Sequence, residues 1–167
     1  ILCTIHRNNN TDEPKRLNAI ISALIKLSEE KDIIIPLHPR TKKLLNVNLD
    51  SATYDTFINN SRIHITEPVS FLEMISLEKN ASLVLTDSGG VQKEAYFFKK
   101  PCIIMRSETE WKEIVEVGAA IIADANEERI IEAYHHFKDN DTIEFPEIFG
   151  DGNAAEFICN ELISNKQ

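Results

Sequence analysis

The sequence predicts an α/β domain built on a doubly wound parallel sheet, and three observations support this fold class. Short apolar runs rich in β-branched residues alternate with segments of helical apolar spacing through most of the chain. With 167 residues and 43% hydrophobic content, the chain can bury one core and is short for two. An apolar strand at residues 83–86, covered on both faces, leads directly into a glycine pair that opens a helix.

Six strands are expected, because each of these runs is short, apolar and mostly β-branched. They lie at residues 1–5, 33–37, 63–65, 83–86, 102–105 and 119–123. Helices are expected between them, with one marked by the apolar spacing at 17–25. A capping box of Ser70 and Glu73 opens another, and a third covers residues 126–137. The alternation favours right-handed crossovers and a parallel sheet.

The end of the chain is expected to form a loop and a final helix. Residues 139–152 contain proline and glycine and have no clear period, whereas Asn153 suits the N-cap of a helix. The apolar face of that helix needs a partner and consists of Ala154, Phe157, Ile158 and Leu162. The sequence also begins at Ile1 inside an expected strand, without an initiator methionine, so we expect a segment of a longer polypeptide.

The composition argues against several classes of protein. A formal charge of -9 disfavours a nucleic-acid surface, which needs a basic stripe, but allows a small phosphorylated ligand. Cys3, Cys102 and Cys159 are widely spaced and flanked by apolar residues, which indicates reduced cytoplasmic thiols rather than disulfides or a zinc site. The adjacent His135 and His136 face different directions on a helix and make a poor metal pair. These cysteine and histidine patterns therefore predict no metal site. No apolar run is long enough to span a bilayer, so no membrane segment is expected either.

The segment 82–98 carries the clearest functional signal, a phosphate-binding turn. Ser88 suits the N-cap of the following helix, and Gly89 and Gly90 leave its first amides uncovered because glycine has no Cβ. An anionic group can therefore approach these N–H donors at the positive end of the helix dipole. Glu94 lies one turn further on the same face, where it could accept hydrogen bonds from sugar hydroxyls. The alternative is that the glycine pair only turns the chain.

Polar residues follow four of the expected strands. They are His6, His38, the pair Asp87 and Ser88, and Arg106. The carboxyl ends of parallel strands share one edge, where open α/β sheets bind ligands, so these residues should converge. His6 with Arg7 could meet phosphate oxygens, because arginine offers a fixed fork of donors and histidine titrates near neutral pH.

Each of these residues also has a plainer interpretation. His6 alone would be a hydrogen-bonded core histidine, and His38 could serve as the start of a helix. Arg106 could pair with one of the glutamates at 108, 110 and 113. Asp87 at a strand end is also typical of a response-regulator phosphoacceptor, but no matching acidic pair follows the first strand.

With these residues in view, the chain resembles the non-hydrolysing UDP-N-acetylglucosamine 2-epimerases over nearly its whole length. Residues 4–12 (TIHRNNNTD) are similar to the family's TxHRxEN segment, and 36–40 (PLHPR) to its PxHP segment. Residues 86–95 (TDSGGVQKEA) are similar to its TDSGGxQEEA signature, and 101–113 to its RxxTEW run. The GDG at 150–152, ahead of a final helix, completes the order. Five segments in register make chance agreement implausible.

The resemblance implies a Rossmann-like, UDP-binding domain over residues 1–167, equivalent to the carboxyl-terminal half of a two-domain GT-B enzyme. It implies that His6 is catalytic and that the substrate-binding residues are Arg7, His38, Phe71, Ser88, Gly89, Gly90, Glu94 and Arg106. Within this set, residues 88–90 would hold the diphosphate, Glu94 the ribose hydroxyls, and the two arginines would lie near phosphate. Pro68 and Phe71 would flank uracil, and His38 matches a position near a second, regulatory UDP-sugar in some members.

The implied reaction interconverts UDP-N-acetylglucosamine and UDP-N-acetylmannosamine by elimination and re-addition of UDP, with no cofactor. By the same resemblance, the carboxylates that move the C2 proton belong to a missing amino-terminal domain. This segment alone is therefore expected to bind UDP weakly and to be inactive. The full-length enzyme is expected to be a cytoplasmic homodimer that serves cell-envelope polysaccharide synthesis.

Two positions depart from the family's pattern, and other functions stay open. Asn9 stands where the family usually has glutamate, and Lys93 where it usually has an acidic residue, which affects the expected sugar contacts and charge near the cleft. A hydrolysing epimerase or a GT-B glycosyltransferase would share the same phosphate turn. A non-catalytic nucleotide-binding module would need no partner domain.

Overall fold

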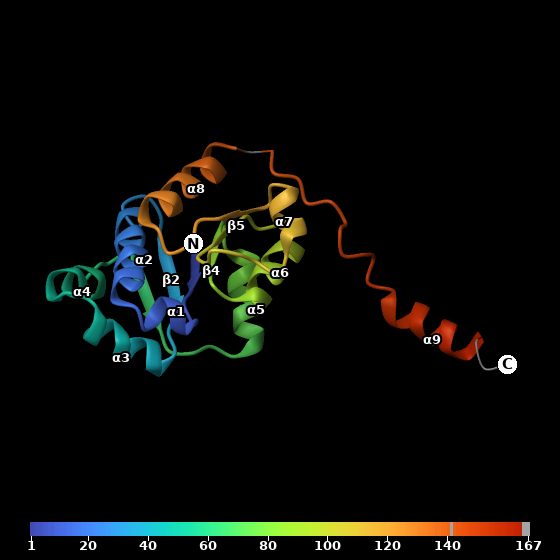
Figure 1. The fold of residues 1–167 in the computed structure, drawn as a ribbon, viewed down its shortest axis with the longest axis horizontal. Coiled ribbons are helices and arrows are strands. Elements are labelled where there is room, and N and C mark those ends of the chain that lie inside the picture. The colour runs from blue at the N-terminus through green and yellow to red at the C-terminus, as the bar shows by residue number, and fades with distance from the viewer. Residues whose placement is uncertain (141, 165–167) are drawn as a thin grey trace.

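A computed structural model describes residues 1–140 and 142–164, which form a parallel sheet flanked by helices (Figure 1). The strands are β1 (Leu2–Thr4), β2 (Ile33–Pro36), β3 (Ile63–Thr66), β4 (Val84–Thr86), β5 (Cys102–Ile104) and β6 (Ala120–Ile122). The helices are α1 (Asn8–Thr11), α2 (Pro14–Leu27), α3 (Pro39–Asn48), α4 (Ser51–Ile58), α5 (Phe71–Asn80), α6 (Gly89–Phe97), α7 (Lys112–Glu116), α8 (Glu127–Asp139) and α9 (Ala154–Ser164).

The sheet has the order β3-β2-β1-β4-β5-β6, and every pair in it is parallel. The chain therefore winds outward from β1 to β3, returns to β4 beside β1, and winds outward again to β6. Such a reversal of strand order opens a crevice at the carboxyl ends of the two central strands, where α/β sheets of this kind bind ligands. The predicted doubly wound α/β fold is confirmed.

Each face of the sheet is covered by its own set of helices. Because side chains alternate along a strand, Cys3 and Leu85 pack into a core with α2 and α8, while Leu2 and Val84 pack into a second core with α6. Helices α2, α3, α4 and α8 lie on the first side of the sheet in Figure 1, and α5, α6 and α7 on the other. This two-sided covering explains why the strands are apolar at consecutive positions rather than alternately.

All six predicted strands are present, and no strand end differs from prediction by more than one residue. The predicted helices at 17–25, after Ser70 and after Asn126 are also present, and both halves of the Ser70–Glu73 capping box form. Helices α1, α4 and α7 were not predicted, and α3 was foreseen only in the interpretation of His38 as a helix start. Two of these have only four or five residues, and α3 is highly polar with only Thr41 and Leu45 buried, so neither kind has a clear apolar stripe.

The final helix forms as predicted but packs against nothing in the described part of the chain. Figure 1 shows α9 apart from the body, at the end of an extended segment. Its apolar residues Phe157, Ile158 and Leu162 are 66%, 55% and 66% exposed. Within the residues that the structure describes, no helix has both the length and the apolar character required to cross a membrane.

Candidate functional site

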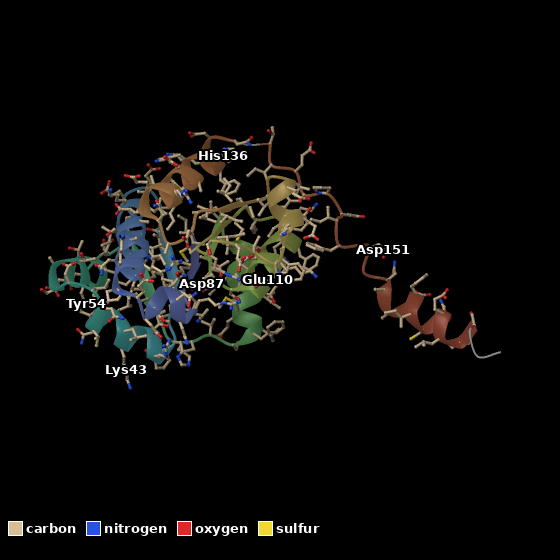
Figure 2. The ribbon with its side chains drawn as sticks, in the orientation of Figure 1. Lys43, Tyr54, Asp87, Glu110, His136 and Asp151 are labelled. Atoms are coloured by element: carbon tan, nitrogen blue, oxygen red, sulfur yellow. The ribbon has the colours of Figure 1, made fainter. Side chains whose placement is uncertain are left out.

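Four loops meet at one edge of the sheet, and we call this place the rim. They follow β2, β1, β4 and β5, which are neighbours in the sheet, and they carry His38, His6, Asp87 and Arg106 respectively. The predicted convergence is therefore confirmed. Figure 2 shows Asp87 and Glu110 close together in the middle of the body, and Arg7 links them by contacting both.

Asp87 is the residue that ties the rim together. Its carboxylate is fully buried and accepts hydrogen bonds from the backbone N–H of His6 at 3.0 Å and of Arg7 at 3.0 Å. It also accepts one from Nδ2 of Asn10 at 3.0 Å, and the same amide donates to the Met105 carbonyl at 2.8 Å. One side chain thus fixes the loop after β1 to the loops after β4 and β5. Asp87 has a structural role here, so the phosphoacceptor interpretation has no support.

The two glycines at the start of α6 have different surroundings. Neither Gly89 nor Gly90 has a positive φ, so the backbone itself does not require glycine at these positions. A Cβ on Gly89 would lie 3.2 Å from Oε2 of Glu110, whereas a Cβ on Gly90 would meet nothing closer than 3.9 Å. A side chain at position 89 would therefore press on Glu110, whereas the space around a Cβ at position 90 is open.

Ser88 occupies the predicted N-cap position, but its hydroxyl forms no capping hydrogen bond. Instead its backbone N–H donates to Oγ1 of Thr86 at 2.9 Å, and Thr86 shares a 2.6 Å hydroxyl contact with Thr4 across β1 and β4. The first N–H groups of a helix have no carbonyl partner within the helix. With the Ser88 side chain uncommitted, the amides at the start of α6 remain available to an anion.

Two arginines face the phosphate turn through one shared carboxylate. Arg106 donates two hydrogen bonds to Glu110, at 2.7 and 2.8 Å, and Arg7 lies 4.0 Å from the same carboxylate. The bidentate contact with Arg106 is the main reason why the pKa of Glu110 falls to about 2. The paired-charge interpretation of Arg106 is therefore confirmed, with Glu110 as the partner. The pair also holds the guanidinium beside Gly89, where phosphate contact stays a prediction.

A group of buried polar residues behind the turn escaped the sequence analysis. Gln92 on α6 is fully buried and its Oε1 accepts a 2.6 Å hydrogen bond from Oγ1 of Thr109, which in turn accepts one from the backbone N–H of Trp111. Nε1 of Trp111 donates to the Gly89 carbonyl at 2.7 Å. These contacts lock the loop after β5 onto α6. Only the TEW letters at 109–111 signalled them in the sequence.

The two histidines of the rim differ in role. His6 is exposed, with its backbone N–H bound to Asp87, so the core-histidine interpretation is wrong. His38 is the N-cap of α3, and its Nδ1 accepts a 3.2 Å hydrogen bond from the backbone N–H of Arg40. The helix-start interpretation of His38 is confirmed, while a ligand role for either histidine stays a prediction.

Glu94 and Phe71 lie on the two helices that flank the turn. Glu94 is half-buried on α6, one turn beyond Gly90, and lies beside the buried Glu78 on α5, whose pKa it helps to raise. Phe71 is the first residue of α5 and is 69% exposed, so its ring is accessible to a ligand. Their expected contacts with ribose and uracil are not tested by the geometry and remain predictions.

The two departures from the family pattern have distinct structural settings. The Lys93 ammonium lies 4.3 Å from the ring centroid of Trp111 and 4.5 Å from that of Phe149, within cation–π range. It therefore joins α6 to the loop after β5 and to the segment after α8. Asn9 is exposed and lines an open hollow of about 490 Å³, together with Asn8, Asp12, Glu13, Pro14, Arg16 and Ser107. In the described residues, no His, Cys, Asp and Glu group is arranged to hold a metal ion.

Comparison with known proteins places this architecture in one family. The family model described as UDP-N-acetylglucosamine 2-epimerase matches residues 1–163. A UDP-N-acetylglucosamine 2-epimerase homolog from Methanococcus maripaludis is 44% identical over 97% of this chain and 44% of its own length. A UDP-2,3-diacetamido-2,3-dideoxy-D-glucuronate 2-epimerase from Pseudomonas aeruginosa is 39% identical, again over 97% of the chain and 44% of its own length.

A solved structure gives the same result in three dimensions. The UDP-GlcNAc 2-epimerase of Methanocaldococcus jannaschii, in complex with UDP-GlcNAc and UDP, superposes with a TM-score of 0.86 and 42% identity, over 98% of this chain and 44% of that one. The chain thus spans about 44% of the length of these relatives. On the family match over nearly all its residues, the chain belongs to the UDP-N-acetylglucosamine 2-epimerase family.

Proposed function

We propose that this chain is the UDP-binding half of a 2-epimerase that interconverts UDP-N-acetylglucosamine and UDP-N-acetylmannosamine. The observation that carries the proposal is the start of α6, where uncapped amides and the open space at Gly90 face the rim beside Arg7 and Arg106. A diphosphate fits these donors because amide dipoles and guanidinium groups both favour its charge. The Methanocaldococcus jannaschii relative was solved with UDP-GlcNAc and UDP bound.

In this proposal, the chain stabilises UDP as a leaving group. The C2 proton of the sugar is weakly acidic, so departure of UDP runs ahead of proton loss and charge builds up on the diphosphate. Preorganised donors at such a charge are worth about 2.7 to 4 kcal/mol each in other enzymes. The residues that we assign to this task are Ser88, Gly89, Gly90, Arg7 and Arg106, with Glu94 on the ribose and Phe71 on the uracil. His6, exposed at the rim, is assigned to the reacting sugar.

We further propose that residues 1–167 form the carboxyl-terminal domain of a two-domain enzyme. The match to only 44% of each relative's length supports this, and so does the uncovered apolar face of α9. The groups that move the C2 proton would then lie on the other domain, because general acid and base groups must be within hydrogen-bond reach of the proton. The cytoplasmic location, the homodimer and the link to cell-envelope polysaccharide stay predictions.

The proposal is tested by titrating the purified chain with UDP and by assaying it with UDP-N-acetylglucosamine. We expect weak UDP binding by calorimetry and no epimerised product by NMR, because this half lacks the proton-transfer groups. Turnover by the chain alone would refute the division of labour. Failure to bind UDP at any accessible concentration would refute the binding role itself.

The parent protein distinguishes the remaining alternatives through its product. UDP-N-acetylmannosamine identifies reversible epimerisation, free N-acetylmannosamine identifies hydrolysis, and dependence on an acceptor identifies a glycosyltransferase. A diacetamido glucuronate substrate should be assayed in parallel, since the 39% identical Pseudomonas aeruginosa relative carries that name. If no nucleotide sugar is converted although UDP binds, a non-catalytic nucleotide-binding module is the answer.

Replacing Arg106 with alanine should lower UDP affinity about tenfold or more, because a hydrogen bond to a charged group contributes about 1.5 to 3 kcal/mol. The loss would also leave the Glu110 carboxylate near the diphosphate without its bidentate partner, with only Arg7 at 4.0 Å. Arg62→Ala is the matched control, because Arg62 pairs with Asp32 at the opposite edge of the sheet. Titration calorimetry measures both variants, and the double variant with Glu110→Ala separates the lost contact from the added repulsion. An unchanged affinity in Arg106→Ala would remove this residue from the site.

A further inference from the structure

Two carboxyl groups are fully buried in the described part of the chain, and they have opposite surroundings. Asp87 accepts hydrogen bonds from three donor groups at the rim. Glu78, near the end of α5, has both carboxyl oxygens shielded from solvent, and no donor of the described residues reaches either of them. A buried carboxylate without a donor is costly, since it loses its hydration without replacement. Glu78 is therefore not suited to carry a charge.

The neighbour of Glu78 explains how the group is tolerated. Glu94 on α6 lies beside it, as a like charge and as a hydrogen-bonding partner. Two carboxylates cannot bond to each other, because both are acceptors, but a protonated carboxyl can donate to a carboxylate. Burial, followed by the charge of Glu94 and the hydrogen bond to it, raises the pKa of Glu78 to about 8. At neutral pH the pair then consists of an acid and a carboxylate.

No cation competes with this arrangement among the described neighbours. Lys93, adjacent to Glu94 on α6, is directed at the rings of Trp111 and Phe149. Lys79, adjacent to Glu78 on α5, is exposed. Glu73, earlier on α5, is committed to the capping box with Ser70. Glu94 is thus the ionisable group that acts on Glu78.

We propose that Glu78 is a positioning residue, a buried acid that donates its proton to Glu94 and so fixes the Glu94 carboxylate to receive the ribose hydroxyls. The inference rests on the proposed UDP-binding function and adds a residue that touches no ligand. One oxygen of Glu94 accepts from Glu78 on the buried side, which leaves the other free on the exposed side. The hydrogen bond restricts the side-chain rotamers of Glu94 before ligand arrives, and this lowers the entropic cost of binding.

The hydrogen bond between Glu78 and Glu94 should depend on pH, and the direction of its effect on ribose recognition can be stated. Below a pH of about 8, Glu78 is protonated and holds Glu94. Above it, Glu78 ionises, the donor is lost, and two carboxylates repel each other. Recognition of the ribose hydroxyls should therefore weaken as pH rises. Since the folded-state pKa is the raised one, the contribution of this group to stability is also complete at low pH and is lost as pH rises towards 8.

The test compares UDP with 2′-deoxy-UDP, because the ratio of their dissociation constants isolates the contact with the 2′-hydroxyl. The two ligands share their diphosphate and uracil titrations, which cancel in the ratio. We expect a ratio of about ten for the unchanged chain at about pH 7, in line with one hydrogen bond to a charged group. The ratio should approach one at about pH 9, where Glu78 is mostly ionised.

Two substitutions at position 78 separate the donor from the bulk of the side chain. Glu78→Gln keeps a donor that does not titrate, so its ratio should stay near that of the unchanged chain at both pH values. Glu78→Met keeps the length and helix preference but has no donor, so its ratio should fall to about two or three at both pH values. Glu94→Ala should remove the discrimination altogether. If Glu78→Met fails to fold, the pH profiles of the unchanged chain and of Glu78→Gln still decide the question.

Infrared spectroscopy gives a readout that needs no ligand. A protonated carboxyl band that disappears between about pH 6.5 and about pH 9, and is missing in Glu78→Gln, supports the proposal. A ratio that depends on Glu94 but not on pH or on position 78 overturns it and leaves the UDP-binding proposal intact. A chain that binds UDP without discriminating between the two ligands overturns the role of both glutamates. Absence of any UDP binding overturns the proposed function and this inference together.

Discussion

Replacing Asp87 with asparagine should lower both the stability of the chain and its affinity for UDP. The carboxylate of Asp87 accepts hydrogen bonds from the backbone N–H groups of His6 and Arg7 and from the side chain of Asn10. An asparagine has nearly the same shape, but it presents an amide donor where one of these groups needs an acceptor. Each donor left without a partner costs about 1 to 3 kcal/mol, and the loop after β1 would be released from β4.

Urea unfolding and UDP titration measure the two effects of Asp87→Asn separately. Asp55→Asn is the control, because Asp55 is exposed in the middle of α4 and its substitution changes the net charge equally. We expect Asp55→Asn to leave both quantities unchanged within error. A variant at Asp87 that unfolds at the same urea concentration as the unchanged chain would show that the rim does not depend on this carboxylate.

Replacing Gly90 with alanine should weaken UDP binding about tenfold or more without destabilising the fold. The new methyl group would meet only Ser88, with its Oγ 3.9 Å away, so the structure accommodates it. Alanine is also the better residue in a helix, by up to about 1 kcal/mol. A diphosphate on the first amides of α6 would, however, be pushed outward by the methyl group and lose part of its charge-assisted hydrogen bonding.

The opposite signs of the two effects make Gly90→Ala a sharp test. Thermal unfolding should show a midpoint that is equal or higher, while titration calorimetry shows weaker binding of UDP. Ser51→Ala serves as the control, since Ser51 is the exposed first residue of α4 and lies outside the rim. If Gly90→Ala binds UDP as tightly as the unchanged chain, the anion does not sit on these amides and the central geometric argument fails.

Gly89 and Gly90 are adjacent in the motif, but their surroundings in the structure differ. Both glycines were predicted to serve close approach of a ligand. In the structure, Gly89 packs closely against Glu110 and Trp111 of the loop after β5. These partners are about 20 positions away along the chain, so this close packing arises only on folding. Only Gly90 keeps the space that the motif predicts for a ligand.

The partnerships of the charged residues could not be obtained from sequence either. Arg106 had three glutamates within reach along the chain, and the structure selects Glu110. Glu78 attracted no interest in the sequence, because its burial and its contact with Glu94 arise only when α5 packs on α6. Lys93 stood out in the sequence as a change of charge, and only the structure shows that its ammonium lies over the rings of Trp111 and Phe149.

The sequence by itself determined the strands, the doubly wound parallel sheet, the glycine pair that opens α6 and the family pattern. These are local signals, because apolar periodicity, capping residues and glycine pairs act over a few neighbouring positions. Tertiary structure alone decided that Asp87 holds the rim together, that His6 is exposed, and which carboxylates pair with which cations. The contacts of Asp87 join residues about 80 positions apart, and they exist only after the two halves of the sheet meet between β1 and β4.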